Sequence, residues 1–352
     1  MVGSYPRPAW FTHQLQGRDL LDALKDCRHQ EAFTDAVRAV IADQEAAGLD
    51  LLTDGQMWFD DYTMGIGSFL WYWFERIHGF DPAKLPHPAR SKAAGVDVPM
   101  LDEVGGVAVL DKISAGPLRL AQLFEIAKGC TPKPIKCCVG AGPAQLSTMA
   151  HFKGGPYKNY RDLAYALCDI FNAEMKSLVA AGAKYIQLED LGAWIPNLTG
   201  EKDFAWVRDI VNRTVAGIEA RVSLHFCLGN TWGNIAHGFT AGGYRRILPR
   251  YFDVHVHEFV LDFAGRDMAD VDVLRDLPPD KSIAAGVINV RSLEIEAPEQ
   301  VATRIREVLE CVPAERVTLT TDCGMKQLPR FCARNKLKSL VQGANIVRAE
   351  LG

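Results

Sequence analysis

The stretch SIAAGVIN at 282–289 is followed by PEQVATRIREVLECVP at 298–313 and by RVTLTTD at 316–322. The first and last of these are short runs rich in apolar and β-branched residues, which is typical of buried strands. The middle stretch places apolar residues at helical spacing, which predicts an amphipathic helix. The three stretches therefore predict a strand–helix–strand unit of an α/β protein.

The same alternation runs through most of the chain. Six further strands are predicted, at 1–5, 49–54, 134–140, 184–190, 221–227 and 252–259. Amphipathic segments such as EAFTDAVRAVIADQEAAG lie between most of them. Eight strands that alternate with helices predict a (β/α)₈ TIM barrel. An open doubly wound sheet is the alternative, although no GxGxxG motif follows a first strand.

The interval from about 57 to 133 is too long for one strand–helix unit. It holds the aromatic segment MWFDDYTMGIGSFLWYWF, a loop rich in proline and lysine, and the strand-like run GGVAVLDKI. We expect an insertion of a helix plus a hairpin between barrel strands 2 and 3, within a single domain that spans residues 1–352. The aromatic side chains are expected to form core or the face of a homo-oligomer, in preference to a cap over a flat ligand.

Composition narrows the class of function. The chain has 352 residues and a net charge of −4, without a long Lys/Arg run, which argues against nucleic-acid or membrane-surface binding. The first residues do not resemble a signal peptide, and the apolar stretches are shorter than a membrane span. We therefore expect a cytoplasmic protein. In a reducing compartment its nine cysteines are more often metal ligands or nucleophiles than disulfide partners.

Four potential metal ligands fall at the carboxyl ends of predicted strands, where barrel enzymes carry their active sites. His225 and Cys227 stand in LHFCLGN, Glu258 in HVHEF and Cys323 in TTDCGM. Residues two apart on a strand face the same side, so His225 and Cys227 project together. Taken singly, each of the four is equally explained by packing, capping or a salt bridge. Their placement at one rim favours a shared metal site.

An imidazole, a carboxylate and two thiolates suit zinc. With about three negative charges from its ligands, such an ion is a poor source of hydroxide but suits the binding of an incoming thiol as a thiolate. A closed site of four protein ligands is also typical of structural zinc, so a non-enzymatic role is the alternative.

Eight motifs occur in the order VGSYPRP, QEAAGLDLLTDGQ, VGAGPAQL, YIQLEDLG, LHFCLGN, HVHEF, GVINVRS and TLTTDCGM. In this order they resemble the catalytic barrel of cobalamin-independent methionine synthases, in the short core or archaeal-type form. The H-x-C motif followed by D-C-G is the specific part of this signal. Isolated GSYP or GP loops are weak signals.

The resemblance implies a zinc-dependent methyltransferase of methionine biosynthesis, with zinc on the four residues named above. It implies that homocysteine binds zinc through sulfur, with its carboxylate near Gly3 and Ser4 and its amine on Gln56 and Glu189. The thiolate would then take a methyl group from a donor that lies across the barrel mouth.

Departures from the family pattern concern the methyl donor. Arg291 stands where the family has a histidine that is proposed as proton donor. An arginine is permanently protonated, so we expect it to orient groups or stabilise an anion. The folate-binding Arg-Cys pair of the long enzymes corresponds to Asp102–Glu103, and their pterin-stacking Trp to Met149. A methyl-corrinoid, free or delivered by a corrinoid protein, is therefore favoured over methyl-folate.

A sister activity on the same scaffold is the alternative. An epoxyalkane:coenzyme M transferase opens an epoxide with a zinc-bound thiolate. Coenzyme M has no amine, which suits the replacement of an acidic residue by Gln56. Its sulfonate would need cations such as Arg7 or Arg291.

Overall fold

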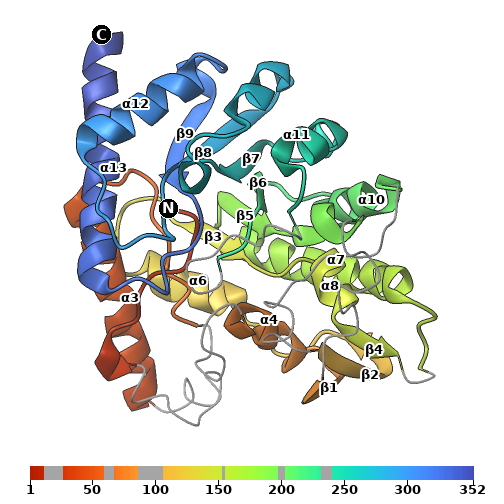
Figure 1. The fold of residues 1–352 in the computed structure, drawn as a ribbon. Coiled ribbons are helices and arrows are strands. Elements are labelled where there is room, and N and C mark those ends of the chain that lie inside the picture. The colour runs from red at the N-terminus through yellow and green to blue at the C-terminus, as the bar shows by residue number, and fades with distance from the viewer. Residues whose placement is uncertain (12–26, 59–66, 86–105, 153–154, 197–202, 231–239) are drawn as a thin grey trace.

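The structure is a computed structural model that describes residues 1–11, 27–58, 67–85, 106–152, 155–196, 203–230 and 240–352 (Figure 1). Its centre is a six-stranded parallel sheet in the order β3-β5-β6-β7-β8-β9. The strands are β3 Lys136–Val139, β5 Tyr185–Glu189, β6 Arg221–Phe226, β7 Glu258–Asp262, β8 Ser282–Ile288 and β9 Val317–Thr321. The sheet is curled, and helices cover its outer face (Figure 1).

Burial explains why these runs form parallel strands. All five residues of β7 are buried, and so are six of the seven residues of β8. Strands covered on both faces are nearly continuous in apolar residues. The helix α6 Leu120–Lys128 precedes β3. The helices that follow between the strands are α7 Pro143–Thr148, α8 Tyr160–Ala180, α10 Ala205–Thr214, α11 Gly243–Ile247 and α12 Pro298–Leu309.

Two helices at one edge of the molecule lie side by side (Figure 1). They are α3 Cys27–Ala47 and α13 Arg330–Leu351. On α13 the buried residues include Leu337, Leu340, Ala344 and Val347, a spacing of three and four that forms one apolar stripe. Among the described residues, no helix combines the length and apolarity needed to cross a membrane.

The predicted eight-stranded barrel is only partly observed. The first two predicted strands, 1–5 and 49–54, do not form strands in the described chain. Leu52 makes an isolated parallel bridge with Ile135, next to β3, and Val2 N donates to Thr321 Oγ1 of β9 over 3.2 Å. The architecture is an α/β fold with a curled parallel sheet. The N-terminal segments 1–5 and 49–54 lie between its two edge strands, β3 and β9.

The predicted bounds of the sixth strand are wrong. Residues 252–257 alternate between buried and exposed side chains, which imitates a strand, but they form turns such as the hydrogen bond from Val254 N to Tyr251 O. The strand β7 therefore begins at Glu258, whereas the predicted strand ended one residue later, at 259.

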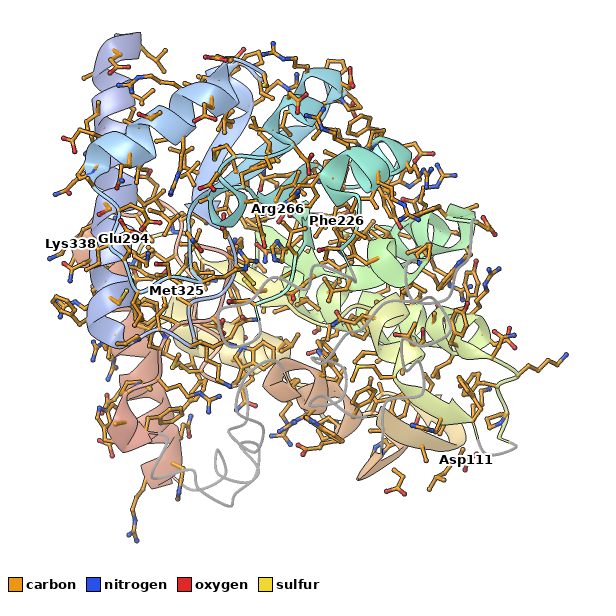
Figure 2. All side chains as sticks on the ribbon, in the orientation of Figure 1. Asp111, Phe226, Arg266, Glu294, Met325 and Lys338 are labelled. Atoms are coloured by element: carbon orange, nitrogen blue, oxygen red, sulfur yellow. The ribbon has the colours of Figure 1, made fainter. Side chains whose placement is uncertain are left out.

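The region between the second and third predicted strands forms a separate layer. It contains α4 Gly67–Phe74 and the antiparallel pair β1 His78–Leu85 and β2 Gly106–Ser114, to which β4 Ala150–Phe152 adds in parallel. This small sheet lies at the edge of the molecule opposite α13, as the labelled Asp111 and Lys338 show (Figure 2).

The aromatic segment is mostly core, as predicted. Trp58, Trp71, Tyr72, Trp73 and Phe74 are all buried. The ring of Trp73 stacks on Phe171 of α8 with centroids 4.2 Å apart, which anchors α4 to the main body. The Phe59 and Phe69 side chains lie outside the described residues.

Candidate metal centre

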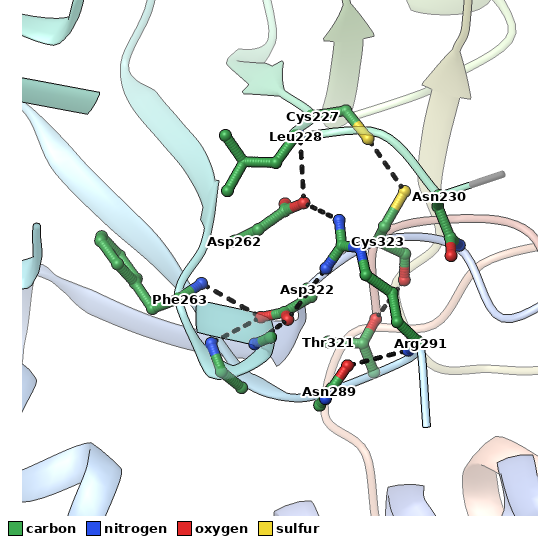
Figure 3. Close-up of polar contacts among 12 residues, drawn as sticks. Cys227, Leu228, Asn230, Asp262, Phe263, Asn289, Arg291, Thr321, Asp322 and Cys323 are labelled. Atoms are coloured by element: carbon green, nitrogen blue, oxygen red, sulfur yellow. Dashed lines mark hydrogen bonds and ion pairs between the residues drawn. The ribbon is translucent and has the colours of Figure 1, made fainter. Parts of the chain in front are cut away.

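Three of the four predicted metal ligands meet at the carboxyl end of the sheet. His225 is in β6, Cys227 follows that strand, and Cys323 follows β9. Their ligand atoms all lie within 4.8 Å of one another, and all three residues are buried. The Sγ atoms of Cys227 and Cys323 are 3.3 Å apart (Figure 3). The chain thus brings two sulfurs and an imidazole together away from solvent.

The orientation of His225 suits a metal ligand. Its Nδ1 lies 3.1 Å from the carbonyl oxygen of Val260 in β7, and since a carbonyl only accepts, Nδ1 carries the proton. The other ring nitrogen, Nε2, is buried and has no hydrogen-bond partner among the described residues. A histidine held by one nitrogen with the other left open is the usual arrangement around a bound metal.

Glu258 is not part of this cluster, so its prediction as a metal ligand is wrong. It is the first residue of β7, at the opposite end of the sheet. There Glu258 Oε2 accepts hydrogen bonds from Arg221 Nη2 at 3.0 Å and Thr318 Oγ1 at 3.1 Å. The error follows from the misplaced strand bounds.

Asp262, the last residue of β7, occupies the place that was assigned to Glu258. It is four residues further along the strand, roughly 13 Å at the rise of an extended chain. Its Oδ1 lies 4.0 Å from His225 Nε2, and both atoms are buried without hydrogen-bond partners in the described chain. Buried polar atoms are rarely left unsatisfied. Two sulfurs, an imidazole nitrogen and an open carboxylate oxygen fit the zinc donor set.

Arg291 ties the surrounding segments together (Figure 3). Its guanidinium donates to Asp262 Oδ2 at 2.6 Å, to Asp322 Oδ2 at 3.2 Å and to the carbonyl oxygen of Gly229 at 2.8 Å. Only 4% of its side chain is exposed. All three nitrogens are engaged by the protein itself, so Arg291 holds the carboxylate of Asp262 and the loop after Cys227 in place.

Asp322 adds a second layer of support. Its carboxylate accepts from the backbone N–H groups of Phe263, Ala264 and Gly265 at 3.1, 2.9 and 2.6 Å. The residue next to Cys323 is thereby fixed to the segment that follows Asp262. A carboxylate with three backbone donors and a guanidinium is fully satisfied, so its position is well defined.

The two thiols differ in acidity. The hydrogen bond from Cys227 lowers the pKa of Cys323 well below its usual range, with help from nearby His225, while the same bond and burial raise the pKa of Cys227. Burial lowers the pKa of His225, but the nearby Cys323 sulfur and the Asp262 carboxylate outweigh it and raise that pKa to about 9. The short contact between the two sulfurs therefore favours one thiolate within the pair.

The four predicted substrate residues lie around the same end of the sheet. Glu189 of β5 is the strand partner of His225 in β6. Burial is the main cause that raises the pKa of Glu189 to about 7. The carbonyl oxygen of Ser4 accepts from Met325 N at 2.7 Å, two residues after Cys323. A Cβ on Gly3 would lie 2.6 Å from Gln56 Oε1, so these two residues are in contact. Gln56 has a φ of 50°, a backbone conformation that is uncommon outside glycine.

Sequence reasoning missed Asp262, Asp322 and Asn230 as parts of the site. Asn230 Nδ2 donates to the carbonyl oxygen of Gly324 at 2.9 Å, which joins the loops that carry the two cysteines. An available signal for Asp262 was the run EFVLD, in which four buried residues end on an acid before a glycine-containing turn. The pair Asp102–Glu103 lies outside the described residues.

A curled parallel sheet that carries His, Cys and Cys at its carboxyl end defines an α/β protein with a candidate thiolate metal centre. Residues 105–346 match the family model described as the catalytic domain of cobalamin-independent synthase. The chain belongs to this family, and the resemblance found in its motifs is confirmed.

Two relatives cover the whole chain. One is a methionine synthase of Saccharolobus solfataricus, 31% identical over 360 residues and matched over 95% of its length. Another is a 2-hydroxypropyl-CoM lyase of Xanthobacter autotrophicus, 30% identical over 381 residues and also matched over 95% of its length.

A B12-independent methionine synthase from Shewanella sp. W3-18-1, solved in complex with selenomethionine, shares the fold. Its TM-score is 0.81 at 24% identity, with 100% of this chain and 97% of that chain covered. The similarity extends over nearly the full length of both chains, so the two proteins share the whole α/β fold.

Proposed function

We propose that the chain transfers a methyl group to the sulfur of a small thiol, with homocysteine as the acceptor. The observation that carries this proposal is the convergence of His225, Cys227 and Cys323 within 4.8 Å. The orphaned oxygen of Asp262 beside them supports it. Family membership supports the same chemistry, because relatives over the full length are named methionine synthase.

His225, Cys227, Cys323 and Asp262 are the residues that would hold zinc. Zinc bound there would supply a Lewis acid that stabilises the sulfur of an acceptor thiol as thiolate. The protein's own part is to keep that centre dry and rigid. Asp322 and Arg291 do this by fixing the two loops on which the sulfurs stand.

Acceptor binding is assigned to the residues around the centre. Gly3 and Ser4 would receive the carboxylate of homocysteine, and Gln56 and Glu189 would receive its ammonium. The support is positional, since Glu189 neighbours His225 and Ser4 contacts the loop after Cys323. We assign Arg291 to positioning, because the protein's own carboxylates and a carbonyl engage its guanidinium.

The donor is proposed to be a methyl-corrinoid, free or delivered by a corrinoid protein. The sequence departs from the folate-binding pattern at Asp102–Glu103 and at Met149, which is 3% exposed. Transfer to coenzyme M is the second candidate, favoured by the full-length relative named 2-hydroxypropyl-CoM lyase. In that case an epoxide would be the alkyl donor.

We also propose that residues 1–352 form one domain and that the segments 1–5 and 49–54 complete a barrel around the curled sheet. The bridge of Leu52 to Ile135 and the hydrogen bond of Val2 to Thr321 support this closure. A cytoplasmic location stays a prediction from composition, and a homo-oligomeric state stays a prediction from the aromatic segment between 57 and 133.

The test combines metal analysis with a substrate matrix. Purified protein should contain about one zinc per chain. Homocysteine or coenzyme M is then offered with methylcobalamin, methyl-tetrahydrofolate or epoxypropane, and products are identified by mass spectrometry. Methionine formed from methylcobalamin supports the proposal. A metal-loaded protein that transfers no alkyl group to any thiol would refute it.

A further inference from the structure

A cavity lies near the amino end of β7, away from the candidate metal centre. Its volume is about 480 Å³, and it is bounded by β9, by residues 48–51 and by one face of α13. Glu258, at the amino end of β7, lines it, whereas Asp262 of the metal centre stands at the opposite end of the same strand. The cavity follows the seam at which the curled sheet is not closed by hydrogen bonds between β9 and β3.

The inner end of the cavity carries polar groups with unused hydrogen-bonding capacity. Lys136 is buried, and its Nζ donates to Gln187 Oε1 at 2.6 Å, a neutral partner for a group with three donors. Thr320 is 2% exposed, and its Oγ1 has no hydrogen-bond partner among the described residues. Both residues line the cavity. Buried polar groups of this kind usually mark a bound water or ligand.

The nearby acid does not satisfy Lys136. Glu258 is held by Arg221 at 3.0 Å and by Thr318 at 3.1 Å. Its charge is therefore already balanced by a guanidinium. Burial lowers the pKa of Lys136, although the charge of Glu258 acts in the opposite direction. The amino group of Met1, whose pKa burial lowers to about 5, also lines the cavity near Lys136.

The outer part of the cavity is apolar. Leu309 of α12 and Leu340, Ala344 and Val347 of α13 line it. The ion pair between Arg348 Nη2 and Asp50 Oδ2, 3.2 Å long, lies among the lining residues with both side chains largely exposed. The site therefore combines a cationic inner end, an apolar wall and a polar entrance.

We propose that this cavity binds a small carboxylic acid with an apolar body. The carboxylate would accept hydrogen bonds from Lys136 Nζ and Thr320 Oγ1, and the apolar body would lie along α13. An ammonium group on the ligand would find no free acidic partner, because Glu258 is engaged by Arg221 and Thr318, so amino acids are poor ligands for this site. This separates the cavity from the acceptor site proposed above, and the inference does not depend on that function.

Binding is measured by calorimetric titration of the full, metal-loaded chain with hexanoate and octanoate, each against its matched primary alcohol. We expect saturable binding of one acid per chain, at least about tenfold tighter than the alcohol. Chelator treatment should leave it unchanged, because the cavity and the metal centre lie at opposite ends of the sheet. The proposal would be overturned if acid and alcohol bound equally well, or if removal of the metal abolished acid binding.

Two variants locate the site. Lys136→Met should weaken acid binding at least about tenfold, and Thr320→Val should weaken it severalfold while keeping side-chain shape. Thr214→Val is the matched control, because Thr214 is equally buried but donates to Ile210 O on α10. If Lys136→Met does not fold, octanoate affinity is measured in two other variants, Thr320→Val and the cavity-filling Ala344→Phe. Unchanged octanoate affinity in folded variants would refute the site.

Discussion

The Sγ atoms of Cys227 and Cys323 lie 3.3 Å apart although the two residues are separated by 96 positions in the chain. They stand on loops after β6 and β9, which have two other strands between them in the sheet. The curl of the sheet is what closes this distance. The candidate metal centre therefore depends on the tertiary fold, and changes to its supports are expected to act on metal binding and stability together.

Replacement of Cys323 by serine should abolish metal retention. A hydroxyl is a much poorer zinc ligand than a thiolate, and Cys323 is the cysteine whose pKa is lowered by its neighbours. We expect zinc content to fall from about one per chain to near zero by plasma mass spectrometry, with an unchanged circular dichroism spectrum. Cys332→Ser on α13 is the matched control and should keep its zinc. A zinc-replete Cys323→Ser protein would contradict the assigned ligand set.

Asp262 and Glu258 form a matched pair of acids on one strand. Asp262→Asn should weaken zinc binding at least about tenfold in competition with a chromophoric chelator, because it removes the carboxylate nearest to His225. Glu258→Gln should leave zinc affinity unchanged, since this side chain binds Arg221 at the other end of β7. The reverse order of effects would restore the ligand set predicted from sequence.

Loss of Arg291 should be costly to stability. Arg291→Gln leaves two buried carboxylates, those of Asp262 and Asp322, without their guanidinium. Breaking a buried ion pair from one side typically costs about 3–5 kcal/mol. Urea denaturation of the metal-free chain measures this. Arg213→Gln, which removes an exposed ion pair with Asp169, should cost less than about 1 kcal/mol.

Asp54 should make stability depend on pH. Burial raises its pKa to about 6, against hydrogen bonds from Gln56 N and Trp58 Nε1. A pKa above the unfolded value of about 4 means that the folded chain binds the proton more tightly. The contribution of Asp54 to the free energy of unfolding is therefore full below pH 4, falls between pH 4 and pH 6, and stays at its lower value above pH 6.

The variant Asp54→Asn removes this pH dependence. Relative to the parent, its unfolding free energy should improve by about 2–3 kcal/mol between pH 4 and pH 7. The measurement is denaturant unfolding at both pH values, with Asp35→Asn on the exposed face of α3 as the control. A constant difference between parent and Asp54→Asn would show that Asp54 does not titrate in this range.

The sequence was a good guide where periodicity reflects burial. β5, β6, β8 and β9 each begin within one residue of the predicted start, because each is a short run rich in apolar and β-branched residues. The family resemblance correctly placed His225, Cys227 and Cys323 at one rim. The residues before β7 were wrongly predicted to form a strand, because buried Val254 and Val256 alternate with exposed neighbours in a segment that forms turns.

Other features were beyond sequence reasoning for physical reasons. Arg291 acts as a positioning residue because it binds the carboxylates of Asp262 and Asp322. These residues lie 29 and 31 positions away in the chain and contact Arg291 only in the folded protein. The segments 1–5 and 49–54 carry strand-like residues, but whether such a run pairs depends on its neighbours.

The long separation of the two cysteines also bears on synthesis of the chain. At about 5–20 residues per second, Cys323 leaves the ribosome roughly 5–20 s after Cys227. During that interval the nascent polypeptide presents an unpartnered thiol and half of a chelating set. The proposed zinc ion would therefore find both sulfurs together only after the last strand, β9, has docked.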